Sequence, residues 1–429
     1  MSSPRQRRRS HNPTRTLAWR ILVRLEQRHF ALHLEDLVHQ TVDEHNLAPR
    51  DRALLYELVA GCVRHKALLE YYLTQCSQRP IDRLDPGLRW VLILAAYQLA
   101  FLQRVPAHAA ANETVEICRH AGHVAWVGYA NAVIRTFARL RAERSVREPA
   151  DLPTRYSHPA WIVQCYADVF GAEQLEAVLQ WNNTVPSHYA RVRGNRDEIL
   201  ASLPAGAAEP ALAFGPDILR VHDTTAVLHS AAFREGKLYL MQPWSVLTAR
   251  QLGVRPGWRV LDMCAAPGGK TIILADDGAH VVALDNSEHR LRALTDNVRR
   301  CHATNVDIRL LDALEALEVF GPRSFDAVLL DAPCANLGVI QRHPEIRWRL
   351  TPDEPSRLAR HQRLLLDIAL RVVKVGGPVL YAVCSVAPAE TTNVVAEISD
   401  AVCEHQALVR PGERGLDGGY SALLRVPNV

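Results

Sequence analysis

Residues 262–271 read Asp-Met-Cys-Ala-Ala-Pro-Gly-Gly-Lys-Thr. This stretch follows the apolar run 259–261, and a run of helical character begins at Thr271. A strand that passes through a glycine-rich turn into a helix is where α/β proteins hold nucleotide-like ligands, because the backbone can approach a ligand closely there. The stretch therefore predicts a ligand-binding turn in an α/β domain.

Two known nucleotide motifs do not fit this turn. Gly-Lys-Thr suggests a P-loop, but that motif needs a glycine five residues before Gly269, where the chain has Cys264. The dinucleotide fingerprint Gly-x-Gly-x-x-Gly is absent. A plain strand-to-helix turn that binds nothing is the other interpretation, and the rest of the chain has to decide between them.

The composition is that of an ordinary soluble protein, with 429 residues, 48% apolar and 22% charged, enough for two or three domains. No apolar run approaches the ~20 residues that span a bilayer, and no signal peptide pattern is visible. Nine cysteines without a Cys-x-x-Cys pair indicate reduced thiols. We expect a cytoplasmic monomer with no membrane contact and no metal site.

The pattern of the chain predicts three domains. Residues 1–148 show apolar side chains at helical spacing and form an all-α domain. Residues 149–236 follow a proline-bearing linker and mix short helices with strands at 188–192, 218–221 and 237–240, which predicts a small α+β module of the RRM or ferredoxin-like kind. Residues 237–429 form the α/β domain.

A basic arm opens the first domain. The first 25 residues contain no acidic side chain, and their arginines are Arg5, Arg7, Arg8, Arg9, Arg15, Arg20 and Arg24. Such an arm suits a phosphate backbone, and a merely solubilising tail is the alternative. Four histidines of the domain lack a partner at metal spacing and are expected on the surface or at helix ends: His65, His108, His120 and His123.

Strands and helices alternate regularly in the third domain. Candidate strands are residues 259–263, 280–284, 307–311, 325–330 and 378–383, with helical segments such as 287–300 and 355–373 between them. This alternation predicts a Rossmann-like, mainly parallel, doubly wound sheet with helices on both faces. Right-handed crossovers then bring the carboxyl ends of the strands to one edge, where ligands bind.

Three aspartates are expected at that edge. Asp285 lies seventeen positions after Gly268, close to the ~20 expected for a carboxylate that holds a ribose diol. Asp312 and Asp331 end the next two strands. A single acidic strand end is commonplace as a helix N-cap, but three at one edge suit a cationic ligand. S-adenosylmethionine, which carries a sulfonium, fits this edge.

Two cysteines at strand ends indicate the acceptor. Cys334 and Cys384 follow the fourth and fifth strands, which are neighbours in a sheet of the methyltransferase type. C5 of cytosine is a poor nucleophile, so its methylation needs a prior covalent attack at C6, for which a thiolate is suited. Each cysteine alone is more often a small buried apolar residue, but the pair at strand ends beside a glycine turn favours catalysis. The residues by themselves do not say which thiol attacks.

Residues 262–271, 331–334 and 381–385 resemble the RNA 5-methylcytosine methyltransferases of the NOL1/NOP2/Sun (Fmu) family. The helical first domain resembles NusB, and the combination resembles the bacterial small-subunit branch of the family. The resemblance implies transfer of a methyl group from S-adenosylmethionine to C5 of a cytosine in 16S rRNA, through a covalent adduct between cysteine and C6.

The resemblance also implies roles for matching residues. Cys384 is the implied nucleophile, and Cys334 is implied in product release. Asp331 is implied near cofactor and base, Asp285 on the ribose and Asp312 near the adenine. The implied cofactor-binding turn consists of Cys264, Ala265, Ala266, Pro267, Gly268, Gly269 and Lys270, the last facing cofactor or base.

The chain departs from the family pattern beside both thiols. Val383 replaces a threonine before Cys384, residues 335–338 read Ala-Asn-Leu-Gly, and residues 389–391 read Ala-Glu-Thr. These changes motivate a second hypothesis, a non-catalytic RNA-binding assembly factor with a methyltransferase fold. Methylation of an exocyclic amine is less favoured, because such enzymes place an aromatic residue where this chain has Cys334.

A basic stretch after Cys334 is the predicted RNA contact. It comprises residues 342–349, with Trp348 available to stack on a base, and Arg357, Arg360 and Arg363 beyond it. The alternative is a solvated basic helix face with one buried tryptophan.

Overall fold

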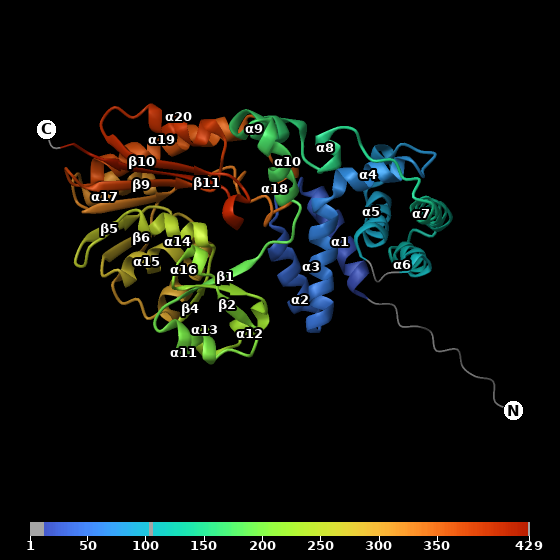
Figure 1. Cartoon of the computed structure of the whole chain (residues 1–429), viewed down its shortest axis with the longest axis horizontal. Helices are drawn as coiled ribbons and strands as arrows, with labels where there is room; N and C mark the ends of the chain where they lie inside the picture. The colour runs from blue at the N-terminus through green and yellow to red at the C-terminus, as the bar shows by residue number, and fades with distance from the viewer. Residues whose placement is uncertain (1–12, 103–105, 428–429) are drawn as a thin grey trace. The chain divides into compact units, whose positions relative to one another are not determined.

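The computed structural model describes residues 13–102 and 106–427 (Figure 1). Their contacts divide the chain into two compact units. The first, here the helical unit, joins Met1–Gln164 to His343–Leu350, and the second contains Cys165–Arg342 and Thr351–Val429. The helical unit thus extends past residue 148 and takes in eight residues from the expected third domain, which we call the inserted segment. The expected small module shares the second unit with the α/β domain.

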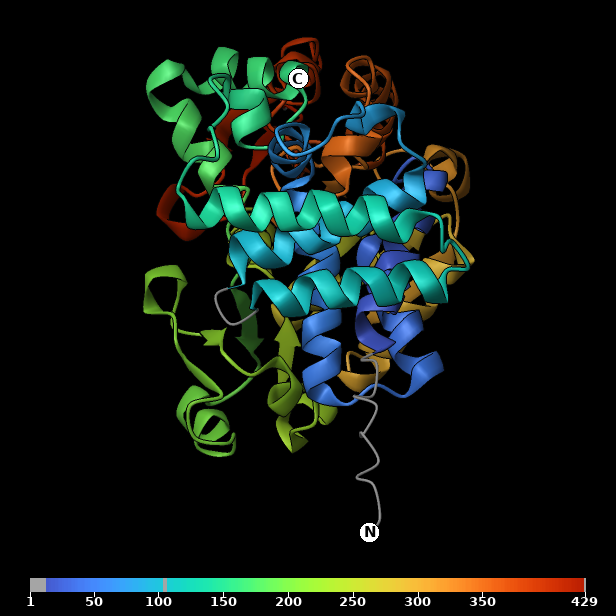
Figure 2. The same ribbon diagram turned by 90° about the vertical axis from the view of Figure 1, so that its right-hand side faces the viewer.

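Helix α5 is the centre of the helical unit. Asp85 caps its start by accepting from Gly87 N, and Pro86 occupies the first turn, where no helical N–H bond is lost. The helix is buried on nearly all sides, Trp90 completely, as expected for a central helix. Figure 2 shows α6 and α7 running side by side. The helices are α1 Pro13–Gln27, α2 Leu34–His45, α3 Pro49–Arg64, α4 Lys66–Thr74, α5 Pro86–Phe101, α6 Ala107–His120, α7 Trp126–Ala142 and α8 Leu152–Arg155, with α9 Ala160–Phe170 crossing into the second unit.

The inserted segment forms the short helix α18 (Ile346–Arg349) within the helical unit. Arg347 is fully buried and donates to the backbone oxygens of Arg64, at 3.3 Å, and Ser157, at 3.0 Å. Trp348 Nε1 donates to Val63 O at 2.8 Å. The prediction that Arg347 contacts RNA is therefore wrong, because it is buried and backbone carbonyls of the helical unit hold its polar groups, while the half-buried Trp348 is tied to the same unit. The four arginines at positions 5, 7, 8 and 9 lie outside the described residues.

The small module has the connectivity βαββαβ. Its four strands are β1 His188–Val192, β2 Ala208–Pro210, β3 Ile218–Val221 and β4 Leu238–Leu240, in the antiparallel order β2-β3-β1-β4. Helices α11 (Arg196–Ala201), α12 (Thr224–Leu228) and α13 (Ala231–Arg234) connect them. This order is typical of ferredoxin-like modules. The short strand β2 is not among the sequence predictions.

The α/β part is built on a seven-stranded sheet in the order β10-β11-β9-β8-β5-β6-β7. Strands β5 to β9 run parallel, and β11 and β10 continue the sheet antiparallel. Their bounds are β5 Arg259–Asp262, β6 His280–Asp285, β7 Val306–Leu310, β8 Ala327–Asp331, β9 Pro378–Val383, β10 Val402–Val409 and β11 Gly419–Arg425. The fold class is thus confirmed, with the five parallel strands close to the predicted positions and the last two not predicted.

Helices connect and flank the strands of this part. They are α10 Ala172–Trp181, α14 Pro243–Arg250, α15 Gly269–Asp276, α16 Glu288–Arg300, α17 Ala316–Phe320, α19 Glu354–Val372 and α20 Thr392–Ala396. Strand β5 pairs with β6 on one side and β8 on the other, so the strand order reverses there. A ligand crevice is expected outside the carboxyl ends of the strands at such a point.

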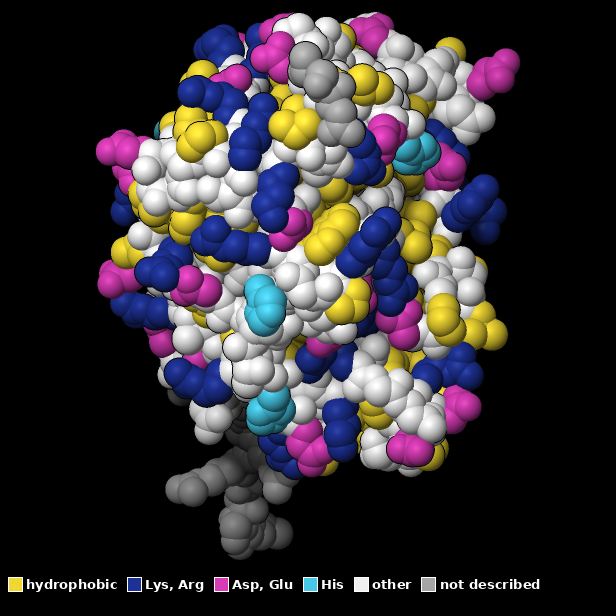
Figure 3. Space-filling view, turned by 90° about the vertical axis from the view of Figure 1, so that its left-hand side faces the viewer, with side chains coloured by type: hydrophobic (Ala, Val, Ile, Leu, Met, Phe, Trp, Pro, Cys, Tyr) yellow, Lys and Arg dark blue, Asp and Glu magenta, His cyan; other side chains and the backbone are white. Residues whose placement is uncertain are grey.

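Charge is mixed on the face shown in Figure 3, where basic and acidic side chains are interspersed with apolar ones. Within the described ranges, no helix is both long and apolar enough to cross a bilayer.

Candidate active site

The glycine-rich turn after β5 has the close packing that its sequence suggests. Gly268 has φ 104°, and a Cβ at this position would lie 2.6 Å from Leu294 Cδ1. A larger residue would therefore suffer both an unfavourable backbone conformation and a steric clash. Pro267 O accepts from Tyr239 OH at 3.1 Å and from Asn297 Nδ2 at 3.0 Å. The turn is thus fixed from the small module and from α16.

Asp262 ends β5 beneath this turn. Its side chain is buried, and Oδ2 accepts from Thr271 Oγ1 at 2.7 Å, which joins the strand to the first turn of α15. Burial raises the pKa of Asp262 from 3.8 to about 7, while the Thr271 hydrogen bond acts in the opposite direction. The residue belongs to the quoted motif, but the sequence assigned it no role.

A cleft of about 580 Å³ opens beside the turn at the ends of β5, β6 and β8. The residues that line it are Met263, Cys264, Ala266, Asp285, Asn286, Arg290, Asp312, Ala313, Asp331, Pro333, His361 and Leu365. The structure thus brings the three predicted strand-end aspartates together in one cavity. Asp285 accepts from Ser287 N at 2.9 Å and pairs with Arg290 at 3.0 Å.

A second cavity, of about 550 Å³, lies on the other side of the turn. It is lined by Tyr239, Leu240, Met241, Gln242, Ser245, Asp262, Cys264, Ala265, Ala266, Pro267, Gly269, Lys270 and Asp331. Three residues line both cavities, namely Cys264, Ala266 and Asp331. Asp331 therefore stands at the border between the carboxylate-rich cleft and a second space of similar size.

Lys270 and Asp331 form a close ion pair at that border. Lys270 Nζ lies 2.5 Å from Asp331 Oδ2, and its side chain is 17% exposed. Burial alone would lower the pKa of Lys270, but the charge and hydrogen bond of Asp331, together with the charge of Cys384, raise it above its usual value. The ammonium group thus stays charged beside the cysteines.

The two cysteines are neighbours. Cys334 Sγ and Cys384 Sγ are 3.3 Å apart, and Asn336 Oδ1 is 2.6 Å from Cys384 Sγ and 3.5 Å from Cys334 Sγ. The hydrogen bond to Cys384 and burial both raise the pKa of the Cys334 thiol well above its usual value. Cys334 therefore keeps its proton, either thiol can be the donor in the contact between them, and Cys384 Sγ also donates to Asn336 Oδ1.

A buried carboxyl group connects the loops that carry the two thiols. Glu390 Oε1 accepts from Ala335 N at 2.8 Å and from Gln362 Nε2 at 3.0 Å, and Oε2 accepts from Ser385 Oγ at 2.5 Å. Ala335 adjoins Cys334, and Ser385 adjoins Cys384. Burial raises the pKa of Glu390, an effect that these three donors partly offset. Glu390 thereby fixes one loop relative to the other.

The sequence missed the positions of Asn336 and Glu390 near the thiols. Asn336 stood out only as a departure from the family pattern, and Glu390 only as a retained residue beside departures. Arg290 and His361, which line the cleft, carried no sequence signal, since each lies on an otherwise ordinary polar helix face.

Comparison with known proteins agrees with this architecture. Residues 249–419 match the family described as 16S rRNA methyltransferase RsmB/F, and residues 12–139 match the NusB family. The ribosomal RNA small subunit methyltransferase B of Pseudomonas putida is 35% identical over 88% of this chain and 86% of its own. The probable enzyme of that name from Bacillus subtilis is 30% identical over 89% and 87%.

The solved structure of PH0851 covers 99% of both chains with a TM-score of 0.77 at 24% identity, which shows a shared fold. The sequence identities of 30% and 35% extend over most of each chain, and so they show membership of the family in addition to a shared fold. The protein belongs to the RsmB/F family of methyltransferases and carries a NusB-family domain at its N-terminal side.

Proposed function

We propose that this protein transfers a methyl group from S-adenosylmethionine to C5 of a cytosine in 16S rRNA, with Cys384 as the nucleophile. The observation that carries the proposal is the meeting of two thiols, 3.3 Å apart, with the Lys270–Asp331 pair at the border of a carboxylate-lined cleft. The names of the relatives support rRNA of the small subunit as the substrate.

The cleft has the chemistry that the cofactor needs. Asp285 and Asp312 provide acceptors for hydroxyl and amino groups. With Asp331, these aspartates outnumber the two cations that pair with them, Arg290 and Lys270, and this excess of carboxylates favours a sulfonium. When bound, S-adenosylmethionine would supply the electrophilic methyl group, held by Asp285, Asp312 and the turn 264–270.

The cysteines divide the remaining work. The Cys384 thiolate attacks C6 of the cytosine, and the electron pair of the C5–C6 bond becomes available at C5, which takes the methyl group. Lys270 and Asp331, which pair with each other, would hydrogen-bond the polar edge of the base as charge moves into the ring. A base then removes the C5 proton, and the Cys384–C6 bond breaks with its electron pair going to the sulfur, which restores the aromatic ring; the sulfur is then protonated.

Cys334 is assigned to the end of the reaction. Its raised pKa keeps it protonated next to Cys384, so it can supply a proton to the departing sulfur. This order of roles is supported by the raised pKa of the Cys334 thiol, because a thiol that keeps its proton is a poor nucleophile.

The test is methyl transfer from labelled S-adenosylmethionine to unmodified 16S rRNA. Cys384→Ala should abolish incorporation, and Cys334→Ala should accumulate a covalent protein–RNA adduct visible on a denaturing gel. Cys403→Ala, at an exposed thiol on β10, is the matched control and should keep full activity. Incorporation undiminished in Cys384→Ala would remove it as the nucleophile.

The same experiment separates the catalytic proposal from that of a non-catalytic assembly factor. Tight binding of rRNA and cofactor by the unmodified protein, without methyl transfer to free RNA or to small-subunit particles, would favour the assembly factor. Mapping 5-methylcytosine in 16S rRNA from cells with and without the protein identifies the target nucleotide.

A further inference from the structure

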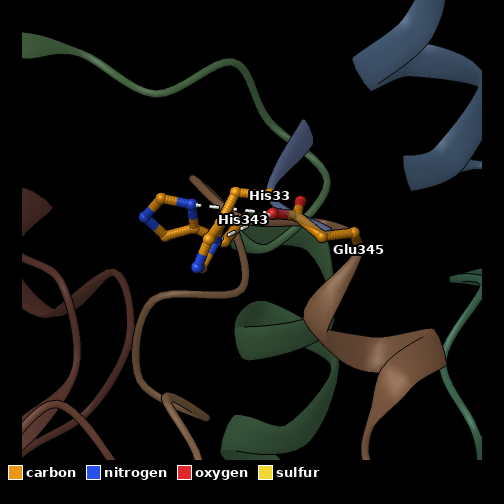
Figure 4. A group of neighbouring side chains, drawn as sticks. All are labelled: His33, His343 and Glu345. Carbon is orange, nitrogen blue, oxygen red and sulfur yellow. Dashed lines mark ion pairs between the residues drawn. The ribbon is translucent and has the colours of Figure 1, made fainter. Parts of the chain in front are cut away.

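Two histidines and a glutamate converge within the helical unit (Figure 4). His33 directly precedes α2, and His343 and Glu345 belong to the inserted segment. Nδ1 of each histidine lies 3.9 Å from Glu345 Oε1, and one ligand atom from each of the three side chains lies within 4.8 Å of the others. No second set of three or more His, Cys, Asp or Glu side chains comes this close in the described part of the chain.

The polar atoms of this cluster are poorly satisfied for their burial. Glu345 is 2% exposed, and Oε1 accepts from Leu34 N at 3.3 Å. Glu345 Oε2 and His343 Nδ1 are buried and have no hydrogen-bond partner among the described residues. A separation of 3.9 Å between nitrogen and oxygen is too long for a hydrogen bond, so the side chains face one another without bonding. Buried polar atoms of this kind need a partner.

We propose that His33, His343 and Glu345 bind a divalent transition-metal ion, for which zinc is the best match. Imidazole nitrogen and carboxylate oxygen bind zinc at about 2.0–2.2 Å, which places tetrahedral ligands about 3.3 Å apart. Each nitrogen therefore has to approach the carboxylate by only about half an ångström, and the most widely separated pair of ligand atoms, within 4.8 Å, has to close by at most about 1.5 Å. The side chains of His33 and His343 are 58% and 33% exposed and have room to move, and a water molecule completes the coordination.

The ion would be a structural one. It joins the start of the inserted segment to the residue that precedes α2, while Arg347 and Trp348 hold the following turn through backbone carbonyls. The segment is short, with α18 only four residues long, so it has little stability of its own. A metal ion bound at its first residue, together with the hydrogen bonds of Arg347 and Trp348, would fix the inserted segment at both ends.

The test uses the full-length protein after treatment with a chelator, titrated with Zn²⁺ by calorimetry and with Co²⁺ as an optical probe. The expected result is one ion per chain and a rise in the unfolding temperature on addition of Zn²⁺. His33→Ala and His343→Ala should each weaken binding by more than about tenfold and lose the thermal shift. His39→Ala, an exposed histidine on α2, is the matched control and should bind as the unmodified protein does.

The thiols near the candidate active site are the competing ligands, and cobalt distinguishes them. Binding through nitrogen and oxygen gives weak visible bands alone, whereas cysteine ligands add an intense thiolate-to-metal charge-transfer band. A thiolate band, or equal affinity in His33→Ala and His39→Ala, would overturn the proposal. Because His33 is exposed, its replacement leaves the fold intact and gives a decision even where His343→Ala does not fold.

Discussion

Asp262 lies at the base of the glycine-rich turn with almost no access to water, being 1% exposed. Thr271 donates to Oδ2, and Oδ1 is buried without a hydrogen-bond partner within the described ranges. An ionised carboxylate in this position is poorly stabilised, which is why burial raises its pKa to about 7. The neutral form is thus the stable one below neutrality.

This pKa makes stability depend on pH. Between about pH 4 and pH 7 the folded protein holds a proton that the unfolded chain releases, so the free energy of unfolding falls as pH rises through this window. A shift of this size corresponds to at most about 4 kcal/mol. Asp262→Asn keeps an acceptor for Thr271 and does not titrate. Urea unfolding at about pH 5.5 and pH 8 should therefore show the variant gaining on the unmodified protein at the higher pH.

The exposed Asp296→Asn, on α16, is the control for this comparison and should parallel the unmodified protein at both pH values. A difference between Asp262→Asn and the unmodified protein that stays constant with pH would contradict the assigned titration.

The loops after β8 and β9 form the thiol pair only when they are held together. Three donors from residues 335, 362 and 385 converge on Glu390, and Gly338 adds a second tie by donating its N–H to Cys384 O at 2.9 Å. A Cβ on Gly338 would lie 2.1 Å from Gly418 O, in the turn before β11, and 3.0 Å from Cys384 O, so the close approach of these segments requires glycine there. The distance between the two thiols thus depends on the loops after β8 and β9 and on the hydrogen bonds that join these loops.

Glu390→Ala should separate catalysis from cofactor binding. The substitution leaves Ala335 N and Ser385 Oγ without their acceptor and lets the two cysteines drift apart, and misplacement of about 1 Å can cost roughly 100-fold in rate. We expect kcat to fall by that order while the cofactor dissociation constant stays within about twofold, because Glu390 does not line the cleft.

Glu397→Ala is the control for Glu390→Ala, since this exposed glutamate pairs with Arg363 at the surface and should leave both values unchanged. Equal losses in kcat and cofactor affinity on changing Glu390 would show that it supports the fold at large instead of the thiols.

Most of the parallel strands could be predicted because they are runs of apolar residues with turns on both sides, whereas β7 alternates apolar and charged residues. Strand β9, for example, was expected at 378–383, and all of its residues are buried. Strand β10 was not predicted, because most of its side chains are exposed and show no alternation. Its position depends on pairing with β11.

The strand-end aspartates and the cysteines followed from topology, since parallel strands share one edge. The role of Asn336 did not, because its approach to the thiols depends on a left-handed backbone with φ 61° and on contacts distant in sequence. The basic segment 342–349 was misread for a similar reason. Its many arginines are typical of an exposed segment. That Trp348 and Arg347 pack into the helical unit follows only from their hydrogen bonds to the carbonyls of Val63 and Arg64, which are distant in sequence.

At the scale of the whole molecule, the inserted segment makes the helical unit discontinuous in sequence. Trp348 packs against its apolar core and donates to Val63 O, and Lys66 Nζ lies 5.3 Å from the centre of its ring. The N-terminal unit is therefore completed by a side chain that lies more than two thirds of the way along the chain.

Trp348→Ala should destabilise this unit by about 2–4 kcal/mol, through a cavity and an unsatisfied carbonyl. Hydrogen exchange should accelerate in α3 and α5 and remain unchanged in β5 to β9. Trp258→Ala, in the second unit, is the matched control: hydrogen exchange should accelerate in β5 to β9 and remain unchanged in α3 and α5. Faster exchange in the sheet alone after Trp348→Ala would contradict this account.

The discontinuity also sets an order of events during synthesis on the ribosome. When Gln164 has emerged, the helical unit still lacks the eight residues that complete it, and these are made only after most of the second unit. At about 5–20 residues per second, that delay is roughly ten to forty seconds. During this interval the nascent helices display the carbonyls and apolar surface that Arg347 and Trp348 later cover, which makes them a natural substrate for chaperones that bind growing chains.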